Sequence, residues 1–108
     1  MNTLQVLQTK QSCYKPEFIK KLPSGNVLYR TGRWHANKKG QPAQPGDKFE
    51  MFLGHTDGKN VLVGTVLANK LRRKTKDNTN RWSYVVEIEK RIDNGVWHGY
   101  TGAGSILF

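Results

Sequence analysis

Three strand-like segments in the middle of the chain constrain its fold more than any other feature. In the first, Lys48–Leu53, apolar residues recur at every second position, which is typical of a strand with one buried face. A continuous apolar run, Val61–Leu67, and a second alternating segment, Trp82–Glu89, follow it. Because the connections between the segments are short, we expect an antiparallel meander.

The flanking regions predict further short elements. Leu4–Gln8 alternates like a short strand, and Asn26–Arg30 has the composition of another. Pro16–Leu22 places a proline at the start of an apolar pattern and is interpreted as a helix of one or two turns. Thr31–Gly40, with glycines near both ends, is interpreted as a loop. The expected fold is one mostly β (α+β) domain over residues 1–108, a barrel of five to seven strands, closed or half-closed, with one or two short helices.

The charge balance points to a polyanionic partner. Eighteen lysines and arginines stand against eight acidic residues, which gives a net charge of +10. Nucleic acid is the first candidate and an acidic protein the second. A membrane is not expected, because the sequence has neither a basic amphipathic helix nor an apolar run approaching twenty residues. The first eleven residues lack the pattern of a secretory signal, so we expect a cytoplasmic protein.

The densest group of cations follows the second strand-like segment. It comprises five basic residues within seven positions, namely Lys70, Arg72, Arg73, Lys74 and Lys76. We interpret it as a loop that a β-scaffold presents to phosphates, with a solvated hairpin tip as the alternative. Further cations, including Arg30, Arg33, Lys38 and Lys39, support phosphate contact.

Trp34 is the aromatic residue that is hardest to assign to a core by pattern, because polar residues and glycines surround it. Its ring could stack on a base, an interaction of about 1–3 kcal/mol, or could plug the end of a barrel. In the first case Arg33 would contact a phosphate or stack, and Asn37 would offer a donor and an acceptor to a base edge. Trp82 and Trp97 alternate with strand residues and are expected in the core.

Three motifs occur in an order that resembles the PUA-like superfamily, particularly its EVE, ASCH and YTH branches. They are Pro45-Gly46-Asp47-Lys48-Phe49, Val63-Gly64-Thr65-Val66 and Arg81-Trp82-Ser83-Tyr84-Val85-Val86. The resemblance covers about half of the chain and implies a pseudo-barrel that binds RNA or DNA. In the EVE and YTH branches it implies a pocket for one base, often modified, with an aromatic residue ahead of the Gly-Asp turn. Trp34 matches that position by order, with Tyr29 near it, whereas the family's opening aromatic strand motif is replaced here by LQVLQ.

Neither a metal site nor a catalytic centre is expected. His35, His55 and His98 are widely separated, and Cys13 is the single cysteine, so zinc-ligand spacing is missing. Glu87 and Glu89 form the closest acidic pair, but they lack the neighbouring acidic residue of a restriction-type nuclease motif. We interpret them as cross-strand partners of the basic run. A hydrolytic enzyme is therefore the least favoured class, and no cofactor is expected.

The sequence thus predicts a non-catalytic module that binds DNA or RNA, and the resemblance adds a modified base as a candidate ligand. The alternative is a small basic inhibitor or anti-defence protein of phage type that binds an acidic host protein. The predicted nucleic-acid contacts are Tyr29, Arg30, Arg33, Trp34, Asn37, Lys38, Lys39, Lys70, Arg72, Arg73, Lys74 and Lys76.

Overall fold

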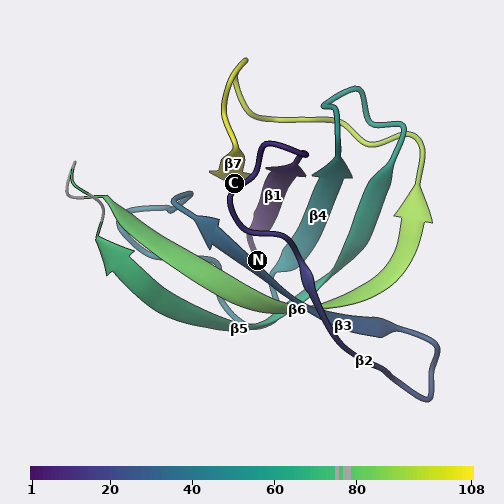
Figure 1. Ribbon diagram of the computed structural model, residues 1–108. Helices are drawn as coiled ribbons and strands as arrows, with labels where there is room; N and C mark the ends of the chain where they lie inside the picture. The colour runs from purple at the N-terminus through teal and green to yellow at the C-terminus, as the bar shows by residue number, and fades with distance from the viewer. Residues whose placement is uncertain (75, 77–78) are drawn as a thin grey trace.

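One mixed sheet of seven strands makes up the fold. The computed structural model describes residues 1–74, 76 and 79–108, without the side chains of Arg73 and Lys74. The strand order is β2-β3-β6-β5-β4-β1-β7 (Figure 1). The strands are β1 (Thr3–Gln8), β2 (Glu17–Lys21), β3 (Val27–Trp34), β4 (Lys48–Leu53), β5 (Val61–Lys74), β6 (Asn80–Ile92) and β7 (Ser105–Leu107). Over the described residues no helix occurs, and so none that could span a bilayer.

The predicted meander is confirmed. Strands β4, β5 and β6 pair antiparallel in sequence order. The bounds of β4 are those expected, whereas β5 and β6 extend beyond Val61–Leu67 and Trp82–Glu89 into a long two-stranded arm. Gly64 in β5 permits this pairing, because a Cβ at that position would lie 1.8 Å from the carbonyl oxygen of Glu87.

The predicted first strand is also confirmed, and it joins the two ends of the chain. β1 lies parallel to β4, with Leu4 opposite Phe49. On its other side β1 pairs antiparallel with β7, where Leu4 lies opposite Leu107. The first and last strands are therefore neighbours at one side of the sheet (Figure 1).

The helix expected over Pro16–Leu22 is wrong. Glu17–Lys21 forms β2, which pairs antiparallel with β3 and has every residue exposed. A helix of one or two turns is marginal by itself, because its nucleation cost is offset by few hydrogen bonds. The strand instead gains a ladder with β3 and an edge-to-face contact between Phe18 and Tyr29, whose ring centroids are 6.1 Å apart.

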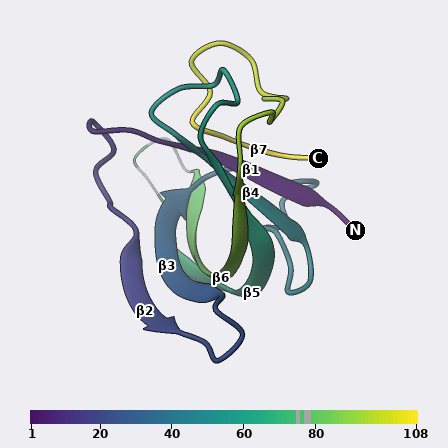
Figure 2. The same ribbon diagram turned by 90° about the vertical axis from the view of Figure 1, so that its right-hand side faces the viewer.

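The barrel was expected to be closed or half-closed and to carry one or two helices; the sheet does not close into a barrel and the described residues form no helix, so the α+β element is wrong, whereas the mostly β class and the five to seven strands hold. The sheet curls strongly but stays open, with β2 and β7 as its edges (Figure 2). Shifts of register between β5 and β6, and between β3 and β6, mark bulges that bend the strands. This curvature bends the sheet, but its two edge strands, β2 and β7, do not pair with each other.

Two apolar clusters pack against the sheet. The larger one combines side chains from β1, β4, β5, β6 and β7 with Trp34 of β3, and Trp82 is buried in it as predicted. The smaller cluster is formed by Phe52, Val61 and Val63. Trp97 packs against this smaller cluster, with its ring centroid 5.1 Å from that of Phe52. Trp97 was expected in the core, and it contacts the core as a half-buried side chain.

Candidate nucleic-acid interface

The candidate site begins where β3 is irregular. The register between β3 and β6 shifts between Thr31 and Trp34. Gly32 lies so close to β6 that an added Cβ would be 2.7 Å from the Cβ of Ser83. The loop expected from Thr31 onward is therefore wrong over its first four residues, because the paired strand continues to Trp34. Because a bulge adds one residue to a strand, the side chains that follow it point to the opposite face of the sheet from the one that simple alternation would give.

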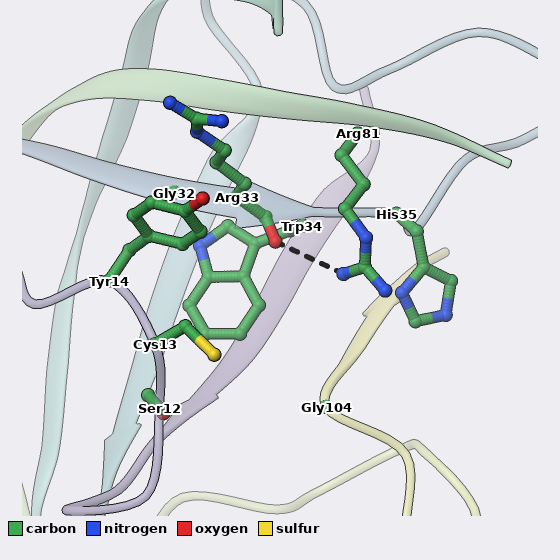
Figure 3. A pocket seen from close by; sticks show the side chains of 9 residues that line it. All are labelled: Ser12, Cys13, Tyr14, Gly32, Arg33, Trp34, His35, Arg81 and Gly104. Atoms are coloured by element: carbon green, nitrogen blue, oxygen red, sulfur yellow. Dashed lines mark hydrogen bonds between the residues drawn. The ribbon is translucent and has the colours of Figure 1, made fainter. Parts of the chain in front are cut away.

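A pocket of about 360 Å³ opens at this irregularity. In Figure 3 the indole of Trp34 lies in the middle of the pocket, with Tyr14 and Cys13 on one side and Arg81 and His35 on the other. We call it the Trp34 pocket. Its lining residues are Ser12, Cys13, Tyr14, Gly32, Arg33, Trp34, His35, Arg81 and Gly104.

Trp34 is both a core residue and a wall of this pocket. Only 8% of the residue is exposed, and it belongs to the larger apolar cluster. Its Nε1–H donates a hydrogen bond to Oγ1 of Thr31 at 3.3 Å. The ring is thus held by packing and by a polar contact, so its orientation is fixed before any ligand arrives.

Two arginines and a histidine give the Trp34 pocket its electrostatic character. The guanidinium carbon of Arg33 lies 4.4 Å from the ring centroid of Tyr14. Nη1 of Arg81 donates a hydrogen bond to the carbonyl oxygen of Arg33 at 3.3 Å. None of the nine described lining residues is acidic. Aromatic surface flanked by guanidinium groups is suited to a planar ligand that carries negative charge.

Two further hollows adjoin the Trp34 pocket, because each shares lining residues with the one before it. The second hollow shares Tyr14 and Arg33 with it and adds Arg30 and Arg72. The third shares Arg30 and Arg72 with the second and adds Lys70. We call these three adjoining hollows the basic groove.

Charges in the basic groove are mostly unneutralised. Among the described residues that line its three hollows, the one acidic side chain is that of Glu17. It lies 3.5 Å from Arg30, and both side chains are more than half exposed. An exposed pair of this kind is worth little in water, so Arg30 remains available to an anion.

Five of the predicted contact residues meet in this groove. Arg33 and Trp34 line its first hollow, and the remaining three, Arg30, Lys70 and Arg72, line the others. The basic run is not the loop that we expected, because β5 continues through Lys74 by pairing with Asn80.

The other members of the basic run lie at or beyond the end of that strand. Lys76 lies in the turn that follows it and is exposed. The side chains of Arg73 and Lys74 lie outside the described part of the structure.

Four predicted contacts lie elsewhere. Tyr29 is half-buried against the larger apolar cluster. Asn37, Lys38 and Lys39 occupy an exposed turn, in which Asn37 accepts a hydrogen bond from the N–H of Gly40 at 3.1 Å. None of these four is among the described residues lining the basic groove.

Sequence reasoning missed seven of the nine residues that line the Trp34 pocket, and three of the seven have large side chains that could contact a ligand, namely Tyr14, His35 and Arg81. Arg81 directly precedes Trp82, so the alternation that assigned Trp82 to the core already implied the opposite face for Arg81. His35 directly follows Trp34, so the position of Trp34 already placed it near the candidate site. Tyr14 carries no such signal, since its neighbours in the pocket from β3, β6 and the C-terminal segment are distant in the sequence.

Comparisons of the chain with protein-family models, with curated proteins and with solved structures gave no match. The case for a function therefore depends on the geometry and charge of the basic groove.

Proposed function

We propose that this protein binds nucleic acid without cleaving it. Phosphates lie along the basic groove, and one base enters the Trp34 pocket. The observation that carries the proposal is the adjacency of the two parts: the pocket that holds a fixed indole shares lining residues with a hollow lined by exposed cations, and that hollow shares residues with the next. Phosphate contacts supply affinity that is independent of sequence, and stacking supplies a place for a base.

The base that enters the Trp34 pocket is an unpaired one. Trp34 is 8% exposed and lies within a pocket rather than on an open surface. The faces of bases inside a duplex are covered by their neighbours, so a base must be single-stranded or flipped out to reach such a ring. Single-stranded DNA or RNA is thus the preferred ligand class.

The PUA-like resemblance adds a further element to the proposal. It assigns base recognition to the segment that precedes Gly46-Asp47, and Trp34 lies in that segment. Modified bases therefore belong among the ligands to be compared. They are a refinement of the proposal, because the charge and aromatic content of the groove suit any unpaired base.

The direct test is fluorescence anisotropy of labelled single- and double-stranded DNA and RNA, with and without modified bases, at two salt concentrations. We expect single strands to bind more tightly than duplexes, with an affinity that falls as salt rises. The protein should first be treated with nuclease, because a chain with a charge of +10 retains nucleic acid from the cell.

The variant for the stacking role is Trp34→Phe, with Trp82→Phe as its control. Removal of the whole ring would create a cavity in the core and obscure any effect on binding. Trp82 is equally buried but lies outside the described lining of the groove. We expect weaker binding of single strands from Trp34→Phe alone. Absence of binding at low salt would refute the proposal and favour a basic inhibitor of a host protein.

A further inference from the structure

Tyr14 is the exposed aromatic residue among the described residues that line the basic groove. It is 40% exposed and lies in the segment between β1 and β2. It lines both the Trp34 pocket and the second hollow, and so does Arg33. The two side chains therefore stand together at the junction through which a strand would pass.

The backbone around Tyr14 is braced by its neighbours. Nε2 of Gln8, a buried side chain of β1, donates a hydrogen bond to the carbonyl oxygen of Tyr14 at 3.1 Å. Nζ of Lys15 donates to the carbonyl oxygens of Thr9 and Lys10 at 2.9 and 2.8 Å. These bonds hold an otherwise exposed segment in one place and keep the Tyr14 ring against Arg33.

The contact between Tyr14 and Arg33 leaves the arginine able to bind. The guanidinium carbon lies over the tyrosine ring, 4.4 Å from its centroid. This cation–π contact uses no N–H donor of the guanidinium in a hydrogen bond, so those donors remain available to a phosphate. Among the described residues, moreover, no carboxylate forms an ion pair with Arg33, in contrast to Arg30 and Glu17.

We infer that Arg33 binds one backbone phosphodiester of the ligand, next to the base in the Trp34 pocket, and that Tyr14 is the positioning residue for it. The inference rests on the proposed function and adds a defined subsite to it. Tyr14 acts by stacking, so its ring matters and its hydroxyl does not. The bound group is a phosphodiester because Arg33 lies where the first two hollows meet, between a base site and the cations beyond it.

The experiment combines substitutions of the protein with neutral linkages in the ligand. Affinities are measured for a labelled single-stranded oligonucleotide and for versions with a methylphosphonate at one linkage after another. The variants are Tyr14→Phe, Tyr14→Leu and Arg33→Gln. Tyr100→Leu is the matched control, because Tyr100 is 76% exposed and lies outside the described lining of the groove.

We expect Tyr14→Leu to weaken binding about three- to fivefold, and Tyr14→Phe and Tyr100→Leu to stay within about twofold of the wild type. Arg33→Gln should weaken it about tenfold or more, the usual range for a charge-assisted hydrogen bond. One methylphosphonate position should cost the wild type a similar factor. The same position should cost much less in Arg33→Gln, because the partner of that phosphate is already gone.

Three results would overturn the inference while leaving nucleic-acid binding intact: full affinity of Tyr14→Leu, an equal loss in Tyr14→Phe, or a methylphosphonate penalty unchanged by Arg33→Gln. If the wild type binds no oligonucleotide at all, the proposed function fails together with the inference. Thermal unfolding of each variant separates these outcomes from loss of the fold. Tyr14 is exposed enough for its substitutions to leave the melting temperature nearly unchanged.

Discussion

The backbone N–H of Ala43 donates a hydrogen bond to the hydroxyl oxygen of Tyr84 at 3.3 Å, and both residues are buried. The bond fastens the segment between β3 and β4 to the middle of β6. Burial raises the pKa of Tyr84 to about 12; the bond from Ala43 lowers it, and the negative charge of Asp47 raises it further. The phenol is therefore neutral in the folded protein at any ordinary pH.

This raised pKa predicts a loss of stability in strong alkali. The unfolded tyrosine loses its proton near pH 10.0, whereas the folded one keeps it to about pH 12. The stabilisation is fully present below pH 10 and disappears as the pH rises through 12, by about 2–3 kcal/mol in total. Urea unfolding at several pH values should show this fall in the wild type. A fall of equal size in Tyr84→Phe would contradict the assignment.

The close approach of β3 to β6 at Gly32 predicts a sensitive position. Gly32→Ala places a Cβ 2.7 Å from that of Ser83 and must push the two strands apart. We expect a loss of about 1–3 kcal/mol in the free energy of unfolding, as for other overpacked sites. Affinity for single strands should also fall, because Trp34 and Arg33 move with the bulge.

Gly104→Ala is the control for this substitution. Gly104 also lines the Trp34 pocket, but its added Cβ would lie at an ordinary 4.0 Å from Trp34. Denaturant unfolding and anisotropy measure both variants. Equal stability of the two would show that β3 does not depend on a glycine at this bulge.

The exposed cations of the groove predict the salt dependence of binding. Each of Lys70→Gln and Arg72→Gln should reduce the slope of log K against log salt by about 0.7 for a single strand. Lys59→Gln carries the same loss of charge outside the described lining of the groove and should leave the slope unchanged. If all three substitutions lowered the slope equally, the effect would come from net charge rather than from the groove.

The buried amide of Gln5 predicts that its replacement by leucine strongly lowers the stability of the fold. Gln5 is fully buried; it donates to the carbonyl oxygen of Val96 at 2.7 Å and accepts from the N–H of His98 at 2.8 Å. The same amide donates to Oε1 of Glu50 at 2.7 Å. Gln5→Leu removes all three hydrogen bonds of this buried side chain and should cost about 2–4 kcal/mol. Urea unfolding tests this, with exposed Gln11→Leu as control. A loss below about 0.5 kcal/mol, the range of surface changes, would contradict it.

The sequence predicts a strand when the strand's own residues alternate between apolar and polar, and fails when the strand forms only through pairing with a distant segment. The strands β4, β5 and β6 were recognisable because their alternating side chains divide between core and solvent. β2 was not, since its strand conformation depends on pairing with β3 rather than on its own pattern. Glu87 and Glu89, expected to pair with the basic run, contact Asn26 and Thr65 instead. The length and the bulges of the β5–β6 arm decide which residues face one another.

The candidate site was also predictable only in part, namely where residue type and local sequence suffice to identify a residue. Trp34, Arg33 and the cations of β5 stand out by residue type, so composition and local context sufficed to select them. Tyr14 joins them only through the path of the β1–β2 segment across the sheet. Conversely, Lys38 and Lys39 have the same charge as the groove residues but lie in a turn apart from it. Charge identifies the class of ligand, whereas the folded chain decides which charges act together.

The parallel pairing of β1 with β4 has a consequence for synthesis on the ribosome. β1 is the first strand to emerge, yet its partner in β4 follows about forty residues later and β7 comes last. The apolar side chains of Leu4 and Val6, which are buried in the folded protein, therefore stay exposed until the β4–β5–β6 meander has been made. The first strand made is thus the last to be covered on both sides, so a nascent chain released before Ser105–Leu107 would keep one edge of β1 open to other strands.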